Sequence, residues 1–99
     1  MEEFVYLIRP VREDFIETMT TEESSIMEKH FDYLKGLLAA GKLILAGPCL
    51  DGAFGICVFR SENWEAAQII LENDPAVALG VMSAELHKYR VSLLQGRNN

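Results

Sequence analysis

One histidine in this chain lies where a general base would be useful. His30 is surrounded by apolar residues that recur at spacings of three and four, one helical turn from Met27 and Leu34. Residues at such spacings share one helix face, so His30 lies on or at the edge of the face that packs against the rest of the fold. It is either a hydrogen-bonded core residue or a base partly removed from water, which titrates near neutrality and suits proton transfer.

Asp74 is the first candidate for an acidic partner of His30. It stands in an Asn-Asp-Pro sequence, which ends a helix without any chemistry, because the residue before proline is biased out of the helical region. A carboxylate beside a helix C-terminus also meets the negative end of the macrodipole, which is unfavourable for stability alone and indicates a function. We therefore expect Asp74, or failing it Glu85, to orient the ring of a catalytic His30.

Four further residues are candidates for binding a substrate. Glu85 and His87 share one face of an extended segment and belong either to a cleft or to a solvated strand edge. Arg9 and Arg12 follow the first strand and could hold a carboxylate or an enolate oxygen bidentately, with Arg9 the first choice for a developing oxyanion. The alternative for both arginines is surface pairing with nearby acids, namely Glu13, Asp14 and Glu17.

Metal and cofactor binding have little support. His30, Asp74, Glu85 and His87 are suitable ligand types, but no local motif such as HExxH brings them together. Neither a GxGxxG sequence nor a P-loop is present, so nucleotide cofactors are not expected. We predict neither a metal nor a cofactor.

Composition narrows the class of protein. The 99 residues form one domain, and 49% hydrophobic with 24% charged residues is an ordinary globular composition. A net charge of −6, with nine dispersed basic residues, disfavours nucleic acid and anionic membranes as partners. No apolar run approaches a membrane span, and Met1-Glu2-Glu3 lacks the basic start of a signal peptide, so we expect a cytoplasmic protein.

Two cysteines, Cys49 and Cys57, lie in or beside the central hairpin described below. Paired strands could bring them together as a disulfide. In a reducing compartment, however, they are expected to be small core residues with free thiols.

The pattern of apolar residues predicts a strand at residues 4–8, which Pro10 ends because proline cannot donate to the ladder. Thr20 and Glu23 have the spacing of a capping box, so a helix starts there, and it ends near Ala40 with Gly41 as a left-handed cap. The residues expected on its apolar stripe are Ile26, Met27, Phe31, Leu34, Leu37 and Leu38.

A hairpin of residues 43–46 and 54–59 follows, joined by turn residues that include Pro48 and Asp51-Gly52. A second helix is capped by Ser61 or Asn63 and stops at 73–75; its buried stripe consists of Trp64, Ala67, Ile70 and Leu71. A short connection at 76–80 leads to an extended segment from 81 to about 94, and 95–99 form a polar tail.

The order β-α-β-β-α-β predicts the ferredoxin-like split arrangement, an α+β fold with a four-stranded antiparallel sheet and both helices on one face. The strands are apolar on both faces, so the face without helices would be left exposed in a monomer. We expect a homodimer in which two sheets pack face to face.

The chain resembles the YciI-like (YCII-related) proteins of the dimeric α+β barrel superfamily. The resemblance runs from residue 4 to about 92 and rests on Arg9-Pro10, Arg12, Asp14-Phe15, Met19-Thr20, Glu22-Glu23, His30-Phe31, Tyr33-Leu34, Gly41-Lys42-Leu43, Ala46-Gly47-Pro48, Asp51-Gly52, Gly55, Asp74-Pro75, Gly80-Val81, Glu85 and His87. It implies a homodimer with a small cleft in each subunit, and a histidine and an aspartate suspected of catalysis, which correspond here to His30 and Asp74. Relatives in the wider superfamily include lactone isomerases, cofactor-free monooxygenases and dehydrohalogenating enzymes.

Two functions follow from these observations. The first is a small-molecule enzyme of lyase, isomerase or dehydrohalogenase type that uses His/Asp acid–base chemistry on a small hydroxylated or carbonyl compound. The second is a non-catalytic small-molecule-binding or accessory homodimer on the same scaffold, because a fold alone does not determine function.

Overall fold

The computed structural model describes residues 1–96, so the last part of the tail predicted at 95–99 lies outside the described residues. Its elements are β1 (Glu2–Pro10), α1 (Thr21–Ala39), β2 (Leu43–Pro48), β3 (Gly55–Ser61), α2 (Trp64–Glu72), α3 (Pro75–Ala78) and β4 (Met82–Tyr89). The strands form one antiparallel sheet in the order β2-β3-β1-β4. The predicted ferredoxin-like α+β arrangement is confirmed.

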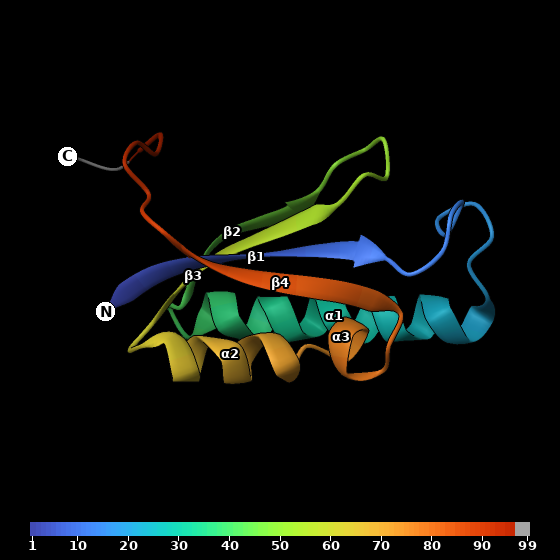
Figure 1. Ribbon diagram of the computed structural model, residues 1–99, viewed down its shortest axis with the longest axis horizontal. Helices are drawn as coiled ribbons and strands as arrows, with labels where there is room; N and C mark the ends of the chain where they lie inside the picture. The colour runs from blue at the N-terminus through green and yellow to red at the C-terminus, as the bar shows by residue number, and fades with distance from the viewer. Residues whose placement is uncertain (97–99) are drawn as a thin grey trace.

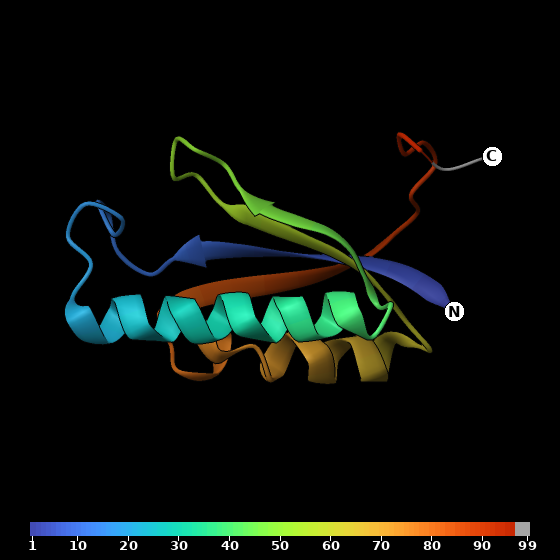
Figure 2. The ribbon, with the colours of Figure 1, turned by 180° about the vertical axis from the view of Figure 1, so that it is seen from behind.

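The molecule has two layers. In Figure 1 all three helices lie below the sheet, and Figure 2 shows the same separation from behind. Within residues 1–96 no helix covers the other face of the sheet, and none is long and apolar enough to cross a lipid bilayer.

Helix α1 begins and ends as its sequence predicts. The Glu23 backbone N–H donates to Thr20 Oγ1 over 3.1 Å, and the Thr20 backbone N–H donates to Glu23 Oε1 over 2.9 Å, which completes the capping box. Gly41 has a φ of 77°, the left-handed conformation that glycine adopts without steric cost. Local backbone chemistry therefore fixes both ends of the helix that carries His30.

The apolar stripe of α1 is narrower than predicted. Ile26 and Leu34 are buried, but Phe31 is 62% exposed and Leu38 is 57% exposed. Each of these two residues follows by one position a residue on the sheet-facing side, and one position turns the helix by about 100°. That rotation carries both side chains out of the interface with the sheet, so assigning them to the stripe was wrong.

The second helical region also differs from the prediction. Asn63 caps α2, because its Oδ1 accepts the Ala66 backbone N–H over 2.8 Å, whereas Ser61 ends β3. The expected connection at 76–80 contains the one-turn helix α3, and Asp74 is the N-cap of that helix. Asp74 does follow the C-terminus of α2, as predicted, but its carboxylate also lies at the N-terminus of α3, where negative charge is favourable, so the macrodipole no longer indicates a function.

Strand β4 ends at Tyr89, five residues before the predicted end near residue 94. Its pairing partner β1 begins at Glu2, and Glu3 opposite Tyr89 is the terminal pair of the ladder. Beyond that pair only Glu2 of β1 is left, and the Val91 backbone N–H donates to the Glu3 side chain, at Oε1, over 2.7 Å. The length of the partner strand, which periodicity in β4 does not report, sets the end.

The core lies between the sheet and the helices. Phe4, Tyr6 and Ile8 of β1 are buried on this side, with Phe4 opposite Phe59 and Tyr6 opposite Cys57 on β3. The helices contribute the buried residues Ile26, Leu34, Ala67, Leu71 and Ala76, whereas Trp64 of the predicted stripe lies at the edge of the core.

The opposite face of the sheet is also apolar near its centre, as predicted. Side chains alternate along β1 and β3, so Val5 and Leu7 lie beside Val58 and Ile56 on the face without helices. We call these four residues the open-face patch. Both cysteines have free thiols, with Cys57 buried in the core, and Cys49 half-buried beside the hairpin turn.

Candidate active site

His30 and Asp74 meet between α1 and α3. His30 Nδ1 lies 2.7 Å from Asp74 Oδ1 and 2.8 Å from Oδ2. The histidine comes from the middle of α1 and the aspartate from the N-cap of α3, which lies against α1 (Figure 1). The Asp74 side chain is 0% exposed and that of His30 is 12% exposed, so the acid is buried and the base lies near the surface.

The Asp74 carboxylate is held by two further donors. Tyr6 donates its hydroxyl to Oδ2 over 2.7 Å, and the Ala76 backbone N–H donates to Oδ1 over 3.0 Å. Hydrogen bonds of this kind favour the charged form of a carboxylate, whereas loss of water favours the neutral form. Three donors around one buried carboxylate therefore replace the water that Asp74 loses on folding.

The ring of His30 has one nitrogen inside and one outside. Because Nδ1 faces a carboxylate, the neutral ring carries its hydrogen on Nδ1 and its lone pair on Nε2. Within residues 1–96, Nε2 makes no hydrogen bond, yet every fully buried side-chain nitrogen and oxygen has a partner. Nε2 therefore lies on the accessible edge of the ring. This arrangement can take a proton from a bound molecule and stabilise the resulting imidazolium through Asp74.

Tyr6 was not predicted as part of this site. In the sequence Tyr6 is one residue of the predicted apolar strand at 4–8. A buried phenol needs a hydrogen-bond partner, however, and that requirement was an available signal. Burial, with contributions from Cys57 and Asp74, raises the pKa of Tyr6 far above its ordinary value. Its hydroxyl therefore stays protonated and remains a donor.

Tyr33, on α1, lies in the same region but makes a different hydrogen bond. It donates its hydroxyl to the Ile70 backbone carbonyl over 2.7 Å. Burial, and secondarily the charge of Asp74, raise the pKa of Tyr33 to about 12. The charge of Asp74 thus affects the pKa of Tyr33, although the two side chains form no hydrogen bond with each other.

The structure does not bring Arg9, Glu85 and His87 to His30. They gather on the face of the sheet opposite the helices, because Ile8 and Ala84 point toward the helices and their neighbours Arg9 and Glu85 point away. Arg9 forms an ion pair with Glu85, and His87 Nε2 lies 2.7 Å from Glu85 Oε2. The hydrogen bonds from His87 and Arg9 lower the pKa of Glu85.

Two predictions change as a result. Glu85 is not the partner of His30, because Asp74 fills that place. Within one chain, Arg9 cannot steady an oxyanion formed beside His30 Nε2, since the sheet separates them. That Arg9, Glu85 and His87 bind substrate in some other way stays a prediction.

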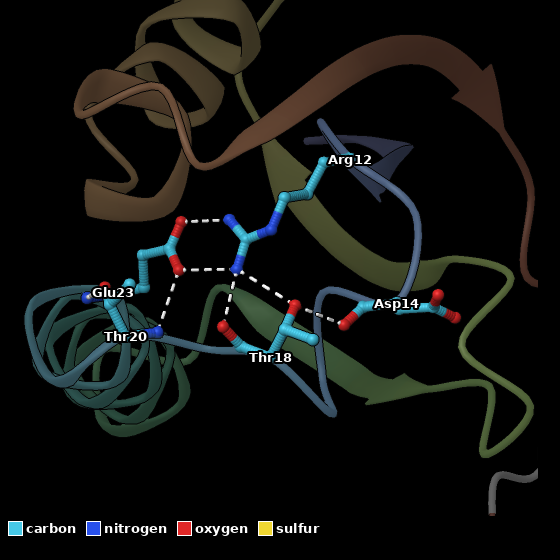
Figure 3. Close-up of polar contacts among 5 residues, drawn as sticks. All are labelled: Arg12, Asp14, Thr18, Thr20 and Glu23. Atoms are coloured by element: carbon cyan, nitrogen blue, oxygen red, sulfur yellow. Dashed lines mark hydrogen bonds and ion pairs between the residues drawn. The ribbon is translucent and has the colours of Figure 1, made fainter.

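Arg12 joins the segment after β1 to the start of α1 (Figure 3). Its guanidinium lies 2.5 Å and 2.8 Å from the two carboxylate oxygens of Glu23 and donates over 2.9 Å to the Thr18 backbone carbonyl. It also lies over the Phe15 ring, 5.1 Å from the centroid. The arginine pairs with an acid of the capping box and with none of the three nearby acids considered from the sequence. Arg12 keeps the pKa of Glu23 at about 2.

Two hollows on the described residues are lined by side chains other than those of His30 and Asp74. One, of about 950 Å³, lies at the end of the sheet beside Arg60, Lys88 and Arg90. The other, of about 450 Å³, lies beside the first half of α1 and includes Met27 and Phe31. The predicted substrate cleft beside His30 Nε2 stays a prediction.

Metal-ligand types are also kept apart. Across residues 1–96, no three His, Cys, Asp or Glu side chains gather into a group that could hold a metal ion. The pair His30–Asp74 and the pair His87–Glu85 lie on opposite faces of the sheet.

Comparison with known proteins identifies the family. The model of the YCII-related domain matches residues 3–88, so the chain belongs to the YCII-related family. Among solved structures it is similar to 5-chloro-2-hydroxyhydroquinone dehydrochlorinase (TftG) from Burkholderia phenoliruptrix AC1100 in complex with 2,5-dihydroxybenzoquinone. The TM-score is 0.66 and the identity 20%, with 88% of this chain and 93% of that chain covered. This likeness shows a shared fold. No functionally curated protein matches the sequence.

Proposed function

We propose that this YCII-related protein is a cofactor-independent small-molecule enzyme in which His30 is the general base. The observation that carries the proposal is that the two nitrogens of the His30 ring have different surroundings. Nδ1 is hydrogen-bonded to a fully buried carboxylate, while Nε2 lies on the accessible edge of the ring. Asp74 keeps the ring in the tautomer with its lone pair outward and stabilises the imidazolium.

The reaction begins when Nε2 takes a proton from a hydroxyl group or from carbon next to a carbonyl group. The electron pair released on the substrate either shifts a double bond, giving an isomer, or expels a leaving group, giving an elimination product. In the first case the imidazolium returns its proton to another atom of the product; in the second it releases the proton to solvent. A positioned base of this kind contributes about 10² to 10⁴ in rate.

The substrate class is a small hydroxylated or carbonyl compound. The similar structure TftG is a dehydrochlorinase, a protein that by its name removes hydrogen chloride from a hydroxylated ring. An elimination of that kind needs a base to take the proton while chloride leaves with the bonding electrons, and here His30 is suited to that task. Chlorinated and unchlorinated polyhydroxylated rings are therefore the first compounds to test.

We also propose that the protein is a cytoplasmic homodimer, joined through the open-face patch. Val5, Leu7 and Ile56 are half-buried and keep part of their surface accessible on this face, whereas Val58 is buried. Apolar surface left on a face without helices favours an interface, and a specific association buries at least about 1,000 Å² in total. Free thiols at both cysteines are typical of a reducing compartment. Arg9, Glu85 and His87 lie on the same face, so their proposed binding role would be exerted at the interface.

Assembly can be tested with one pair of substitutions. Leu7→Glu places a charge in the open-face patch, whereas Ile69→Glu places the same charge on an exposed part of α2. Sedimentation should show a dimer for the unaltered protein and for Ile69→Glu, and a monomer or weakened dimer for Leu7→Glu. A well-folded monomer of unaltered sequence at micromolar concentration would refute the dimer.

A non-catalytic binding protein is the second candidate function. Two observations favour it over catalysis at His30: His30 lines neither of those two hollows, and the guanidinium groups expected to hold a substrate oxygen are already paired, Arg9 with Glu85 and Arg12 with Glu23. Arg12 remains a proposed substrate-binding residue only if a ligand displaces Glu23.

A screen separates the two functions. Small phenolic, quinone, lactone and 2-oxo compounds are tested by thermal shift, since a ligand of the native state raises the melting temperature, and each hit is then assayed for turnover. The enzyme proposal expects turnover that is lost in His30→Ala and kept in Lys29→Ala, an exposed change on the same helix. Hits that bind equally to His30→Ala and are never converted favour the binding protein.

A further inference from the structure

The phenol of Tyr6 is fixed in position by the centre of the sheet. Tyr6 lies in the middle of β1, with Cys57 of β3 on one side and Leu86 of β4 on the other. Its ring is fully buried and packs edge-on against Phe59, with 5.6 Å between centroids. Because packing fixes the position of the Tyr6 hydroxyl, this hydroxyl determines where the Asp74 carboxylate must lie to accept its hydrogen bond.

The two oxygens of Asp74 are held separately. The Ala76 backbone N–H donates to Oδ1 and the Tyr6 hydroxyl donates to Oδ2, over 3.0 Å and 2.7 Å. Two donors on different oxygens fix the plane of the carboxylate, whose terminal torsion is otherwise broad. His30 Nδ1 then meets both oxygens at nearly equal distances, 2.7 Å and 2.8 Å. Without Tyr6, Oδ2 would keep only its contact with His30, so only Oδ1 would be held by a donor other than His30.

We propose that Tyr6 is a positioning residue of the candidate active site: its hydroxyl sets the orientation of Asp74 and limits how strongly that carboxylate attracts the proton of His30. The inference rests on the proposed function, and it assigns a role beyond the His30–Asp74 pair. Tyr6 acts through Asp74 and makes no contact with a substrate.

The groups around Asp74 allow the effect of the Tyr6 hydrogen bond on His30 to be measured separately from other changes of charge. Those facing it are Tyr6 on β1, Cys57 on β3, and Tyr33 and His30 on α1. Burial raises the pKa of Cys57 to about 12, and burial likewise raises the pKa values of Tyr6 and Tyr33. These three groups stay neutral near pH 7, so removing the Tyr6 hydroxyl changes hydrogen bonding without changing their charge.

The test measures the ionisation of His30 in Tyr6→Phe by NMR. The chain has two histidines, and His87 lies on the opposite face of the sheet, where it serves as an internal reference. With one donor fewer, the Asp74 carboxylate attracts the imidazolium proton more strongly, so the titration midpoint of His30 should rise by about 0.5 to 1 pH unit. That is less than the shift of 1–3 units that a full neighbouring charge produces.

Tyr33→Phe is the matched control, because it removes a phenolic hydroxyl from the same region that bonds the Ile70 carbonyl and not Asp74. A His30 midpoint that moves in Tyr6→Phe and stays in Tyr33→Phe supports the proposal. Equal midpoints in the two variants overturn it, since a merely structural tyrosine would lower stability without changing the titration.

If Tyr6→Phe does not fold, the phenol can be altered without being removed. Replacing the tyrosines by 3-fluorotyrosine in the Tyr33→Phe background makes the Tyr6 hydroxyl a stronger donor, and the His30 midpoint should then fall; an unchanged midpoint overturns the proposal. Neither measurement needs a substrate. Absence of turnover on every compound would therefore refute the proposed function alone, and an unmoved titration would refute the role of Tyr6 alone.

Discussion

Replacing Asp74 by asparagine should separate the fold of this protein from its proposed chemistry. The amide has the shape of the carboxylate, so its oxygen can still accept the Ala76 N–H and cap α3. Its NH₂ group then takes the place of Oδ2, beside Tyr6 and His30. There it donates to His30 Nδ1, which forces the ring hydrogen onto Nε2. The lone pair needed by a general base then points inward.

The magnitudes can be worked out from the contacts of the carboxylate. In Asp74→Asn the Ala76 N–H still has an oxygen acceptor, whereas the Tyr6 hydroxyl faces the NH₂ group and can only accept from it. Each of these two bonds changes from one with a charged acceptor, worth about 1.5–3 kcal/mol, to a neutral one of about 0.5–1.5 kcal/mol, a loss of about 1 kcal/mol each, so the free energy of unfolding should fall by about 2 kcal/mol. Asp74→Ala loses the cap, about 1 kcal/mol, and leaves the buried Tyr6 hydroxyl without a partner, about 1–3 kcal/mol. With the cavity added, the alanine variant should lose about 3–5 kcal/mol.

Urea denaturation measures both losses, and NMR of the His30 ring reports the tautomer. Turnover of Asp74→Asn, on whichever compound the screen identifies, should fall by about 10²–10⁴ while the protein stays folded. A folded asparagine variant with undiminished turnover would refute the role of Asp74 in catalysis. Equal stability of the alanine and asparagine variants would refute the hydrogen-bond assignment itself.

Three further results are expected. The pKa of Glu23 is lowered from 4.5 to about 2, so the stability that Glu23 contributes is complete above pH 4.5 and is lost as the pH falls toward 2; unfolding of Arg12→Ala should depend less on pH across that window. At pH 8 a thiol reagent should modify half-buried Cys49 and leave native Cys57 unmodified, because burial raises the pKa of Cys57 to about 12; fast reaction of both would contradict this. Gly41→Ala should lower stability by about 1 kcal/mol through its φ of 77° alone, since an added Cβ meets nothing within 4 Å, and an unchanged unfolding midpoint would contradict it.

The sequence predicts the elements of this fold well because local signals mark them. The capping box at Thr20, the left-handed Gly41 and the alternation in β1 each report a local backbone requirement that the fold keeps. The end of β4 and the exposure of Phe31 are different, because they depend on the length of a partner strand and on which side of a helix meets the sheet. Such tertiary facts have no local signal.

The residues of the candidate site likewise include some that the sequence predicted and some that it did not. His30 and Asp74 were predicted as partners and are 2.7 Å apart. The macrodipole argument for Asp74 does not account for this success, whereas the resemblance to the YCII-related proteins indicated the same two residues. Tyr6 was missed, since a tyrosine in an apolar strand looks like any β-former until its hydroxyl is placed. Arg9 was expected near His30, but the alternation of β1 sends it to the other face.

Strand β1 links the two halves of the proposed function. Tyr6 faces the helices and holds Asp74, while its neighbours Val5 and Leu7 face outward in the open-face patch. Because side chains alternate strictly along a strand, a slip of one residue would move Tyr6 into the interface and Leu7 toward Asp74, so the register of β1 is specified from both faces at once. Substitutions on the outer face can therefore change assembly without touching the hydrogen bonds of Asp74. Leu7→Glu should accordingly dissociate the proposed dimer while the His30 ring keeps its tautomer, and a changed tautomer in that variant would mean that the two faces are coupled.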